Sequence, residues 1–118
     1  MSFSVLLSLY SKESPDFLRQ SLDSIFNQIL LPNEVVLVEY GPLTDELYAV
    51  LVKYPQLKIV KLEKNGGLGK ALNEGLKHCS YDIVARMDTD DIAKPDRFEK
   101  QIKFLEENPE ILCSLLFN

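Results

Sequence analysis

The feature that most constrains the fold is a regular alternation of apolar runs and amphipathic stripes along the whole chain. Apolar runs rich in β-branched and aromatic residues, typical of buried strands, occupy residues 3–10, 35–40, 57–62 and 82–87. Between them, apolar residues recur every three or four positions, which predicts helices. Four strand–helix units favour right-handed crossovers and an α/β fold, with three α/β/α layers around a mainly parallel sheet.

The predicted helices are bounded by capping and breaking residues. Ser14, Pro15 and Asp16 are typical of a helix N-terminus, and we expect that helix to end at Pro32 and Asn33. We expect Thr44 to cap the second helix and Pro95 to open the last one. An apolar stretch, Ile111 to Phe117, predicts a further strand at the end of the chain.

Length and charge exclude several classes of protein. With 118 residues, the chain has room for one core, so residues 1–118 are treated as a single domain. A net charge of −5 argues against nucleic acid as a partner. The uncharged apolar runs, such as that at Ile29 to Pro32, are far shorter than the roughly 20 residues that span a bilayer. The residues from Met1 to Tyr10 lack the basic region of a signal peptide.

Cysteine and histidine usage narrows the chemistry further. Cys79 and Cys113 form no C-x-x-C pair, which favours a reducing, cytoplasmic compartment. His78 is the only histidine, so a multi-histidine metal site is not expected, and its place near a helix end indicates a structural role.

In parallel α/β sheets, ligands bind beyond the carboxyl ends of the strands. One such end carries Asp88-Thr89-Asp90-Asp91. Asp88 and Asp90 would share one side of an extended segment, and hard carboxylate oxygens suit Mg²⁺ or Mn²⁺. An acidic loop before a helix explains the same residues equally well. Arg86, within the preceding strand, needs a partner, either one of these carboxylates or a phosphate.

Two other strand ends carry weaker signals. Asn65-Gly66-Gly67-Leu68-Gly69 could bring backbone amides close to a phosphate or sugar, although a tight turn with close helix packing at Gly75 accounts for the glycines too. The segment is neither a P-loop nor a dinucleotide fingerprint. Glu39 could accept a hydrogen bond from a nucleobase, and Tyr40 could stack on one. The alternative is an ordinary strand end with an exposed acid.

Together these segments resemble the N-terminal half of a family 2 inverting glycosyltransferase with the GT-A fold. The resemblance covers nearly the whole chain and is most specific in its last two segments. The chain is also similar to enzymes of bacterial capsule, exopolysaccharide and lipopolysaccharide synthesis. The matching residues are Ser8 to Ser11, Ser21 to Gln28, Val36 to Gly41, Asn65 to Gly67 with Ala71, Asn73 and Gly75, and Met87 to Asp91 followed by Pro95, Arg97, Glu99, Lys100 and Gln101.

The resemblance implies a role for each matched residue. Asp88 and Asp90 would form the D-x-D pair, with Asp90 on a Mg²⁺ or Mn²⁺ ion that bridges the donor diphosphate and Asp88 at the ribose or the metal. Glu39 would accept from the base, Tyr10 would line the nucleotide pocket, and Asn65 and Gly67 would lie near the base and ribose. Glu39 is one methylene longer than the family's Asp, and Tyr40 replaces its second Asp. A Glu at this position still offers two acceptor oxygens, so uridine is favoured as the base.

The family's general base follows the D-x-D motif in the second half of its domain, so we expect it beyond Asn118. The chain would then be a truncated GT-A fold that holds the donor and the metal. It would lack the general base and the site for the carbohydrate or lipid-linked acceptor, so its turnover would be poor or absent. Its setting would be the cytoplasm or the inner face of the cytoplasmic membrane. The alternative is a non-catalytic nucleotide-binding or interaction module with a vestigial D-x-D motif.

An incomplete sheet leaves an edge strand exposed, and exposed edges and apolar faces promote association. We therefore expect self-association, with Ile111 to Phe117 as a candidate contact segment.

Overall fold

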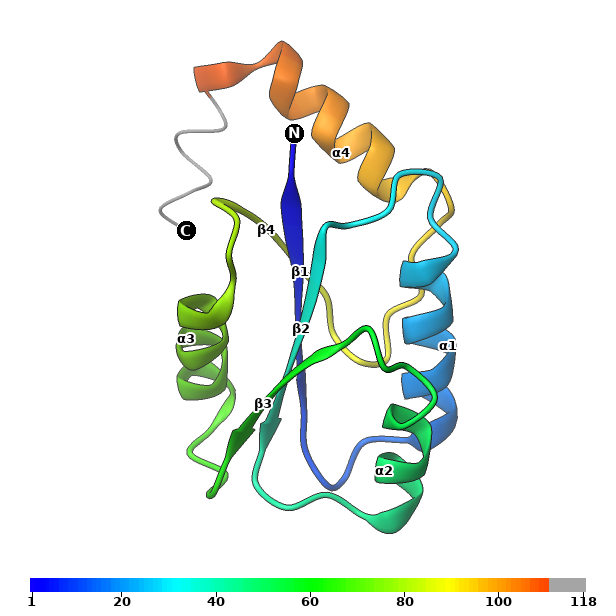
Figure 1. The fold of residues 1–118 in the computed structure, drawn as a ribbon, viewed down its shortest axis with the longest axis vertical. Helices are drawn as coiled ribbons and strands as arrows, with labels where there is room; N and C mark the ends of the chain where they lie inside the picture. Colours follow the sequence, from blue (N-terminus) through cyan, green and yellow to red (C-terminus); the bar gives the residue numbers. More distant parts are fainter. Residues whose placement is uncertain (111–118) are drawn as a thin grey trace.

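A computed structural model describes residues 1–110, and its elements follow the predicted order (Figure 1). The strands are β1 (Phe3–Leu9), β2 (Glu34–Tyr40), β3 (Lys58–Leu62) and β4 (Ile83–Arg86). The helices are α1 (Pro15–Phe26), α2 (Asp45–Leu51), α3 (Leu68–His78) and α4 (Arg97–Glu107). The strand predicted for Ile111 to Phe117 lies outside the described residues.

The four strands form one sheet in the order β3-β2-β1-β4, and every neighbouring pair is parallel. This confirms the predicted parallel sheet. The central strand β1 pairs on both sides, so that Val5 lies opposite Val35 of β2 and Ala85 of β4. The chain adds β2 and β3 on one side of β1 and then places β4 on the other. The change of direction makes the gap between the ends of β1 and β4 the point at which such sheets bind ligands.

Helices cover both faces of the sheet, which confirms the three-layer arrangement (Figure 1). Leu22 of α1, Leu47 of α2 and Phe98 of α4 belong to one core cluster, packed on Val5 and Leu37. On the other face, Ala71 of α3 packs against a second cluster that includes residues of β1 and β2. The alternation of side chains along each strand therefore supplies two separate cores.

Helix α3 lies close to the sheet because of Gly75. A Cβ atom at this position would lie 2.5 Å from Cδ1 of Leu6 and 2.7 Å from Cγ2 of Val38. Only glycine fits such a separation without moving the helix or the two side chains. The close packing that the sequence indicated at Gly75 is thus confirmed.

Two helix boundaries differ from the prediction, although the predicted caps are confirmed. The hydroxyls of Ser14 and Thr44 accept from backbone amides three residues on, at 3.4 Å and 3.3 Å. Helix α1, however, ends at Phe26 rather than continuing to Pro32. Helix α4 begins at Arg97, two residues after the proline expected to open it. The residues between the predicted and observed ends contact each other instead, since the Ile29 amide donates to the carbonyl oxygen of Pro95 at 2.9 Å.

Strand β4 is less buried than its apolar sequence predicts, because within the described residues it pairs only with β1. Ile83, Val84 and Ala85 are half-buried and Arg86 is exposed. No ion pair to Arg86 occurs in residues 1–110, and because its exposed guanidinium is solvated, the position does not require one of the aspartates as a partner. A contact of Arg86 with a phosphate stays a prediction. The carbonyl oxygen of Arg86 accepts from Nη2 of Arg97 at 3.4 Å.

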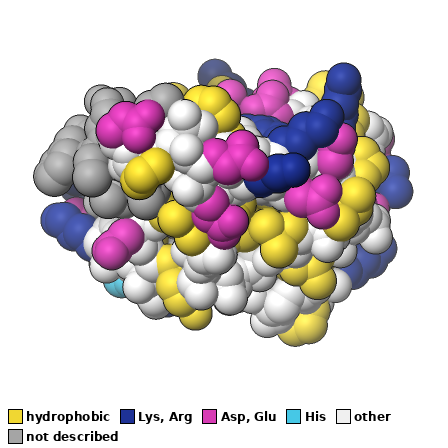
Figure 2. Space-filling view, turned by 90° about the horizontal axis from the view of Figure 1, so that it is seen from above, with side chains coloured by type: hydrophobic (Ala, Val, Ile, Leu, Met, Phe, Trp, Pro, Cys, Tyr) yellow, Lys and Arg dark blue, Asp and Glu magenta, His cyan; other side chains and the backbone are white. Residues whose placement is uncertain are grey.

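A groove of about 460 Å³ lies between β4 and α4, lined by apolar residues that include Phe98, Ile102 and Phe104. The end of the molecule that carries α4 shows acidic, basic and hydrophobic side chains interspersed (Figure 2). No helix within residues 1–110 has the length and apolar character needed to cross a bilayer.

Candidate functional site

The candidate site lies where the chain leaves β1 and β4, the two strands at the change of direction in the sheet. Tyr10 follows β1 directly, and Met87 continues β4 by donating its amide to the carbonyl oxygen of Leu6 at 3.1 Å. Asp88 comes next. The sheet therefore brings the predicted nucleotide-pocket residue and the predicted D-x-D motif to the same edge.

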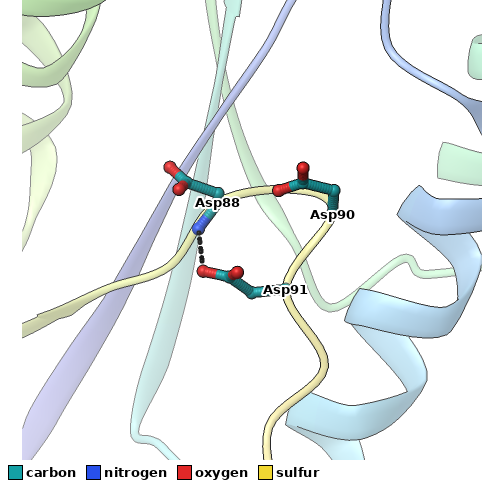
Figure 3. A group of neighbouring side chains, drawn as sticks. All are labelled: Asp88, Asp90 and Asp91. Carbon is teal, nitrogen blue, oxygen red and sulfur yellow. Dashed lines mark hydrogen bonds between the residues drawn. The ribbon is translucent and has the colours of Figure 1, made fainter.

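The aspartates form a turn rather than the extended segment that was predicted (Figure 3). The Asp91 amide donates to the carbonyl oxygen of Asp88 at 3.0 Å, and the Asp91 carboxylate accepts from the Asp88 amide at 3.2 Å. The expectation was wrong because these local hydrogen bonds, available to an Asp three residues on, close the backbone. Asp88 and Asp90 are still brought together, now by the turn.

All three carboxylates are exposed, and one oxygen from each lies within 4.8 Å of the others. Figure 3 shows the Asp88 and Asp90 carboxylates on the same side of the turn, whereas Asp91 lies on the other side with one oxygen engaged by the backbone. The oxygens that remain available fit the preference of Mg²⁺ and Mn²⁺ for hard ligands, with coordination completed by a substrate's phosphates. Asp88 and Asp90 are thus the residues that could hold such an ion.

Helix α1 and the segment after it hold the turn and the following loop through three polar side chains: Ser21 and Ser24 of the helix, and Gln28 two residues beyond its end. The Ser21 hydroxyl donates to the carbonyl oxygen of Asp88 at 3.3 Å, and the Ser24 hydroxyl accepts from the Ala93 amide at 3.0 Å. Gln28 donates to Lys94 and accepts from the Phe98 amide. These polar residues, known from sequence only as a motif, therefore position the aspartate turn and the loop after it.

Glu13 is a site residue that the sequence did not reveal. Burial raises its pKa, and the negative charge of Asp90, and then that of Asp88, raises it further. The Thr89 side chain lowers the pKa of Glu13 and so opposes these two charges. The Thr89 hydroxyl is buried and makes no hydrogen bond within the described part of the chain. The residue comes from the loop after β1, so only the strand order places it beside the aspartates.

Glu39 lies at the end of β2 and is 3% exposed, not the exposed acid of the alternative interpretation. It lies two residues after Leu37 in the strand, so the two side chains lie on the same face of the sheet, the face that packs on α1 and α2. Burial raises the pKa of Glu39, while Lys61 and the Tyr48 hydroxyl oppose the rise. A partly desolvated carboxyl at a strand end can accept a strong hydrogen bond from a ligand placed above it.

Tyr10 lies on the opposite face and stacks on Tyr40, with ring centroids 5.3 Å apart and planes 22° apart. Both rings belong to the cluster under α3. A ligand that lies across the ends of β1 and β2 would therefore meet aromatic rings from one face and Glu39 from the other.

The glycine loop before α3 completes this edge. The Asn65 side chain accepts from the Gly67 amide at 3.0 Å, and Gly67 has a φ of 97°, a conformation that favours glycine. The loop packs on Gly41, where a Cβ atom would lie 3.3 Å from the Asn65 nitrogen. Asn65 and Gly67 are exposed, so their polar groups are accessible to a ligand.

His78 lies away from this edge, as its predicted structural role requires. It ends α3, and its carbonyl oxygen accepts from Nζ of Lys58 at the start of β3, at 2.7 Å. The start of a parallel strand lies at the edge opposite the carboxyl ends.

Comparison with known proteins assigns this chain to a family. The family model described as glycosyl transferase family 2 matches residues 4–117. An amylovoran biosynthesis glycosyltransferase of Erwinia amylovora is 54% identical over 115 residues, which make up 95% of this chain and 43% of that protein. The chain spans about two fifths of the length of the curated relatives it matches.

Solved structures share the fold. The crystal structure of residues 1–349 of Staphylococcus aureus TarS in complex with UDP-GlcNAc has a TM-score of 0.78 and 32% identity, covering 91% of this chain and 32% of that one. A mannosyltransferase from Pyrobaculum calidifontis in complex with GDP-Man and Mn²⁺ has a TM-score of 0.75 and 26% identity, covering 87% of this chain and 32% of that one.

Proposed function

Because this chain belongs to glycosyl transferase family 2, we propose that it is the donor-binding part of a transferase that moves a sugar from a UDP-linked donor to an acceptor in surface polysaccharide or lipopolysaccharide synthesis. Residues 1–118 would act as one domain. The amylovoran relative supports the pathway class, and the UDP-GlcNAc complex of TarS supports a uridine donor.

One observation carries the proposal: Asp88 and Asp90 form a carboxylate pair at the change of strand direction, beside Tyr10 and near the end of β2. An ion held there would offset negative charge on the donor diphosphate, which is the charge that develops as the sugar leaves. The Mn²⁺ complex of the mannosyltransferase supports this assignment. The chain's own part is to hold the turn that brings these carboxylates together, a turn closed by the hydrogen bond from the Asp88 amide to one oxygen of Asp91.

The remainder of the donor would lie across the strand ends. Glu39 would accept from the imide N–H of uracil, Tyr10 would pack against the base, and Asn65 and Gly67 would face the base and ribose. Asp88 would also reach the ribose. The loop's contact with Gly41 supports this grouping, since it joins the Asn65 side of the pocket to the end of β2.

An inverting transfer also needs a base that takes the proton of the attacking hydroxyl. Glu99, Glu106 and Glu107 are exposed on α4, which leads away from the aspartate turn. We therefore assign the base, and the carbohydrate or lipid-linked acceptor, to residues other than these. The chain alone would bind donor without efficient transfer.

Two further proposals concern the setting of the protein. The free thiol of Cys79 suits a reducing compartment, so the chain would act in the cytoplasm or at the inner face of the cytoplasmic membrane. Within residues 1–110, one side of β4 pairs with no strand and lies beside the apolar groove, which supports self-association with a second copy.

Isothermal calorimetry with UDP, with and without Mn²⁺, tests the proposed function. We expect binding heat that requires the ion and disappears in Asp90→Asn. A folded wild-type chain that gives no ion-dependent heat would contradict a donor-binding role and favour a non-catalytic module with a vestigial motif.

A further inference from the structure

The stacked pair of Tyr10 and Tyr40 is unequal in its exposure. Tyr40 is 7% exposed and belongs to the buried cluster under α3, whereas Tyr10 is only partly buried at its margin. A ring centroid separation of 5.3 Å with an angle of 22° gives an offset stack. Tyr40 is therefore the fixed member of the pair, and Tyr10 is the member that a ligand can reach.

The backbone on either side of Tyr40 is also fixed. Tyr40 is the last residue of β2 and lies opposite Leu62 of β3. The next residue, Gly41, donates its amide to the carbonyl oxygen of Leu62 at 3.1 Å. Gly41 has a φ of 97° and packs on Asn65, so the strand end cannot shift without moving the loop. The backbone that carries the Tyr40 ring is therefore held in place.

The charges around Tyr40 connect it to the aspartate turn. Burial raises the pKa of its phenol, the charge of Glu13, the Tyr10 ring and the charge of Asp88 raise it further, and the Ser8 side chain opposes them. The ring thus stays neutral near neutral pH and lies in the electrostatic neighbourhood of the metal-binding turn.

We propose that Tyr40 is a positioning residue that holds the Tyr10 ring in the plane needed to pack against the flat base of a nucleoside diphosphate. Fixing the plane before binding removes the entropic cost of ordering that ring on binding. The inference rests on the proposed function. It further requires that Tyr40 act on the nucleoside part of the donor and not on the part held by the ion.

Binding of two ligands separates these parts: UDP with Mn²⁺, and inorganic diphosphate with Mn²⁺. We expect Tyr40→Leu to weaken UDP binding by roughly tenfold, as for loss of a base-stacking contact, and to leave diphosphate binding unchanged. Tyr40→Phe, which keeps the ring, should bind UDP within about twofold of the wild type. Adding Tyr40→Leu to Tyr10→Leu should cause little further loss, because the first residue acts through the second.

Tyr54→Leu is the matched control. Tyr54 also stacks on an aromatic ring, that of Phe26, at 5.9 Å and 18°, but in the contact between α1 and the turn after α2. Its substitution should lower the melting temperature and leave UDP binding unchanged. Tyr40→Met fills the space with an unbranched side chain and serves as the test variant where Tyr40→Leu melts below the assay temperature.

The outcomes distinguish the two proposals. A folded wild type that binds no UDP contradicts the proposed function, and the role of Tyr40 with it. Wild-type UDP binding that is matched by the Tyr40 variants, or an equal loss of UDP and diphosphate, overturns the positioning role alone.

Discussion

Gln28, two residues after the end of α1, donates from Nε2 to the carbonyl oxygen of Lys94 at 2.6 Å, and so joins the segment after the first helix to the loop that follows the aspartate turn. Its Oε1 accepts from the Phe98 amide at 3.1 Å, and the residue is 5% exposed. A single buried amide therefore satisfies two backbone groups that α4 and its preceding loop leave open.

Replacing Gln28 with Ala should leave the buried Phe98 amide and the part-buried Lys94 carbonyl oxygen unpaired and lower the free energy of unfolding by about 2–3 kcal/mol. Because the loop connects directly to the turn, ion-dependent UDP binding should weaken as well. Urea unfolding and calorimetry measure the two effects. Asn27→Ala, at the exposed neighbouring position, is the control. Equal stability of the two variants would contradict the role given to Gln28.

Replacing Asp88 or Asp90 with Asn should weaken UDP binding in the presence of Mn²⁺ by at least about tenfold, or about 1.4 kcal/mol, because each change removes a charged oxygen ligand. The melting temperature should not fall, since the side chains are exposed and repel one another. Asp82→Asn, at the opposite end of β4, changes the net charge equally and should bind as the wild type does. A comparable loss in Asp82→Asn would point to a general charge effect.

Glu39→Gln should stabilise the protein at neutral pH. The pKa of Glu39 is raised, so the stability that this residue contributes is fully present below the ordinary value of 4.5 and is lost as the pH rises through the folded-state pKa. The amide carries no charge to desolvate, so the melting temperature of the variant should exceed that of the wild type at pH 7. The difference should shrink as the pH falls below 4.5.

The same substitution should weaken UDP binding by about threefold or more, because a neutral amide oxygen is a weaker acceptor than a carboxylate. Glu63→Gln, at an exposed position, should alter neither property. A melting temperature for Glu39→Gln that is lower than that of the wild type at pH 7 would show that the carboxylate stabilises the strand end.

Two glycines of α3 should respond in opposite directions to Ala. Gly75→Ala places a Cβ atom 2.5 Å from Leu6 and should destabilise by about 1–3 kcal/mol through overpacking. Gly69→Ala meets no atom within 4 Å and should stabilise by about 0.4–1 kcal/mol through the lower entropy of the unfolded chain. Thermal melts of both variants would contradict the packing argument if the two shifts had the same sign.

Association through the side of β4 that pairs with no strand in residues 1–110 should depend on Phe104, which is 50% exposed and lines the groove beside that strand. Light scattering of the wild type should show a mass that rises with concentration. Phe104→Glu should reduce this rise, whereas Phe17→Glu, at the similarly exposed Phe17 of α1, should not. A wild type that stays monomeric at high concentration would refute self-association.

The sequence by itself determined the order of the elements, the parallel sheet and most caps. These follow from local rules: buried parallel strands read as continuous apolar runs, and a helix shows its buried face as a stripe. The same rules located Tyr10, Glu39, Asn65 and Asp88 at strand ends. They did not predict the turn at Asp88 to Asp91, because a hydrogen bond from a side chain to the backbone depends on conformation rather than on periodicity.

Only the tertiary structure decided which strand ends are neighbours. The order β3-β2-β1-β4 places Glu13 beside the aspartates, Tyr10 on Tyr40 and α1 behind the loop before α4. It also leaves β4 half-buried with Arg86 in solvent, because burial depends on the elements packed around a strand as well as on its own residues. Contacts between residues far apart in sequence depend on how the whole chain packs, and no local pattern of residues encodes them.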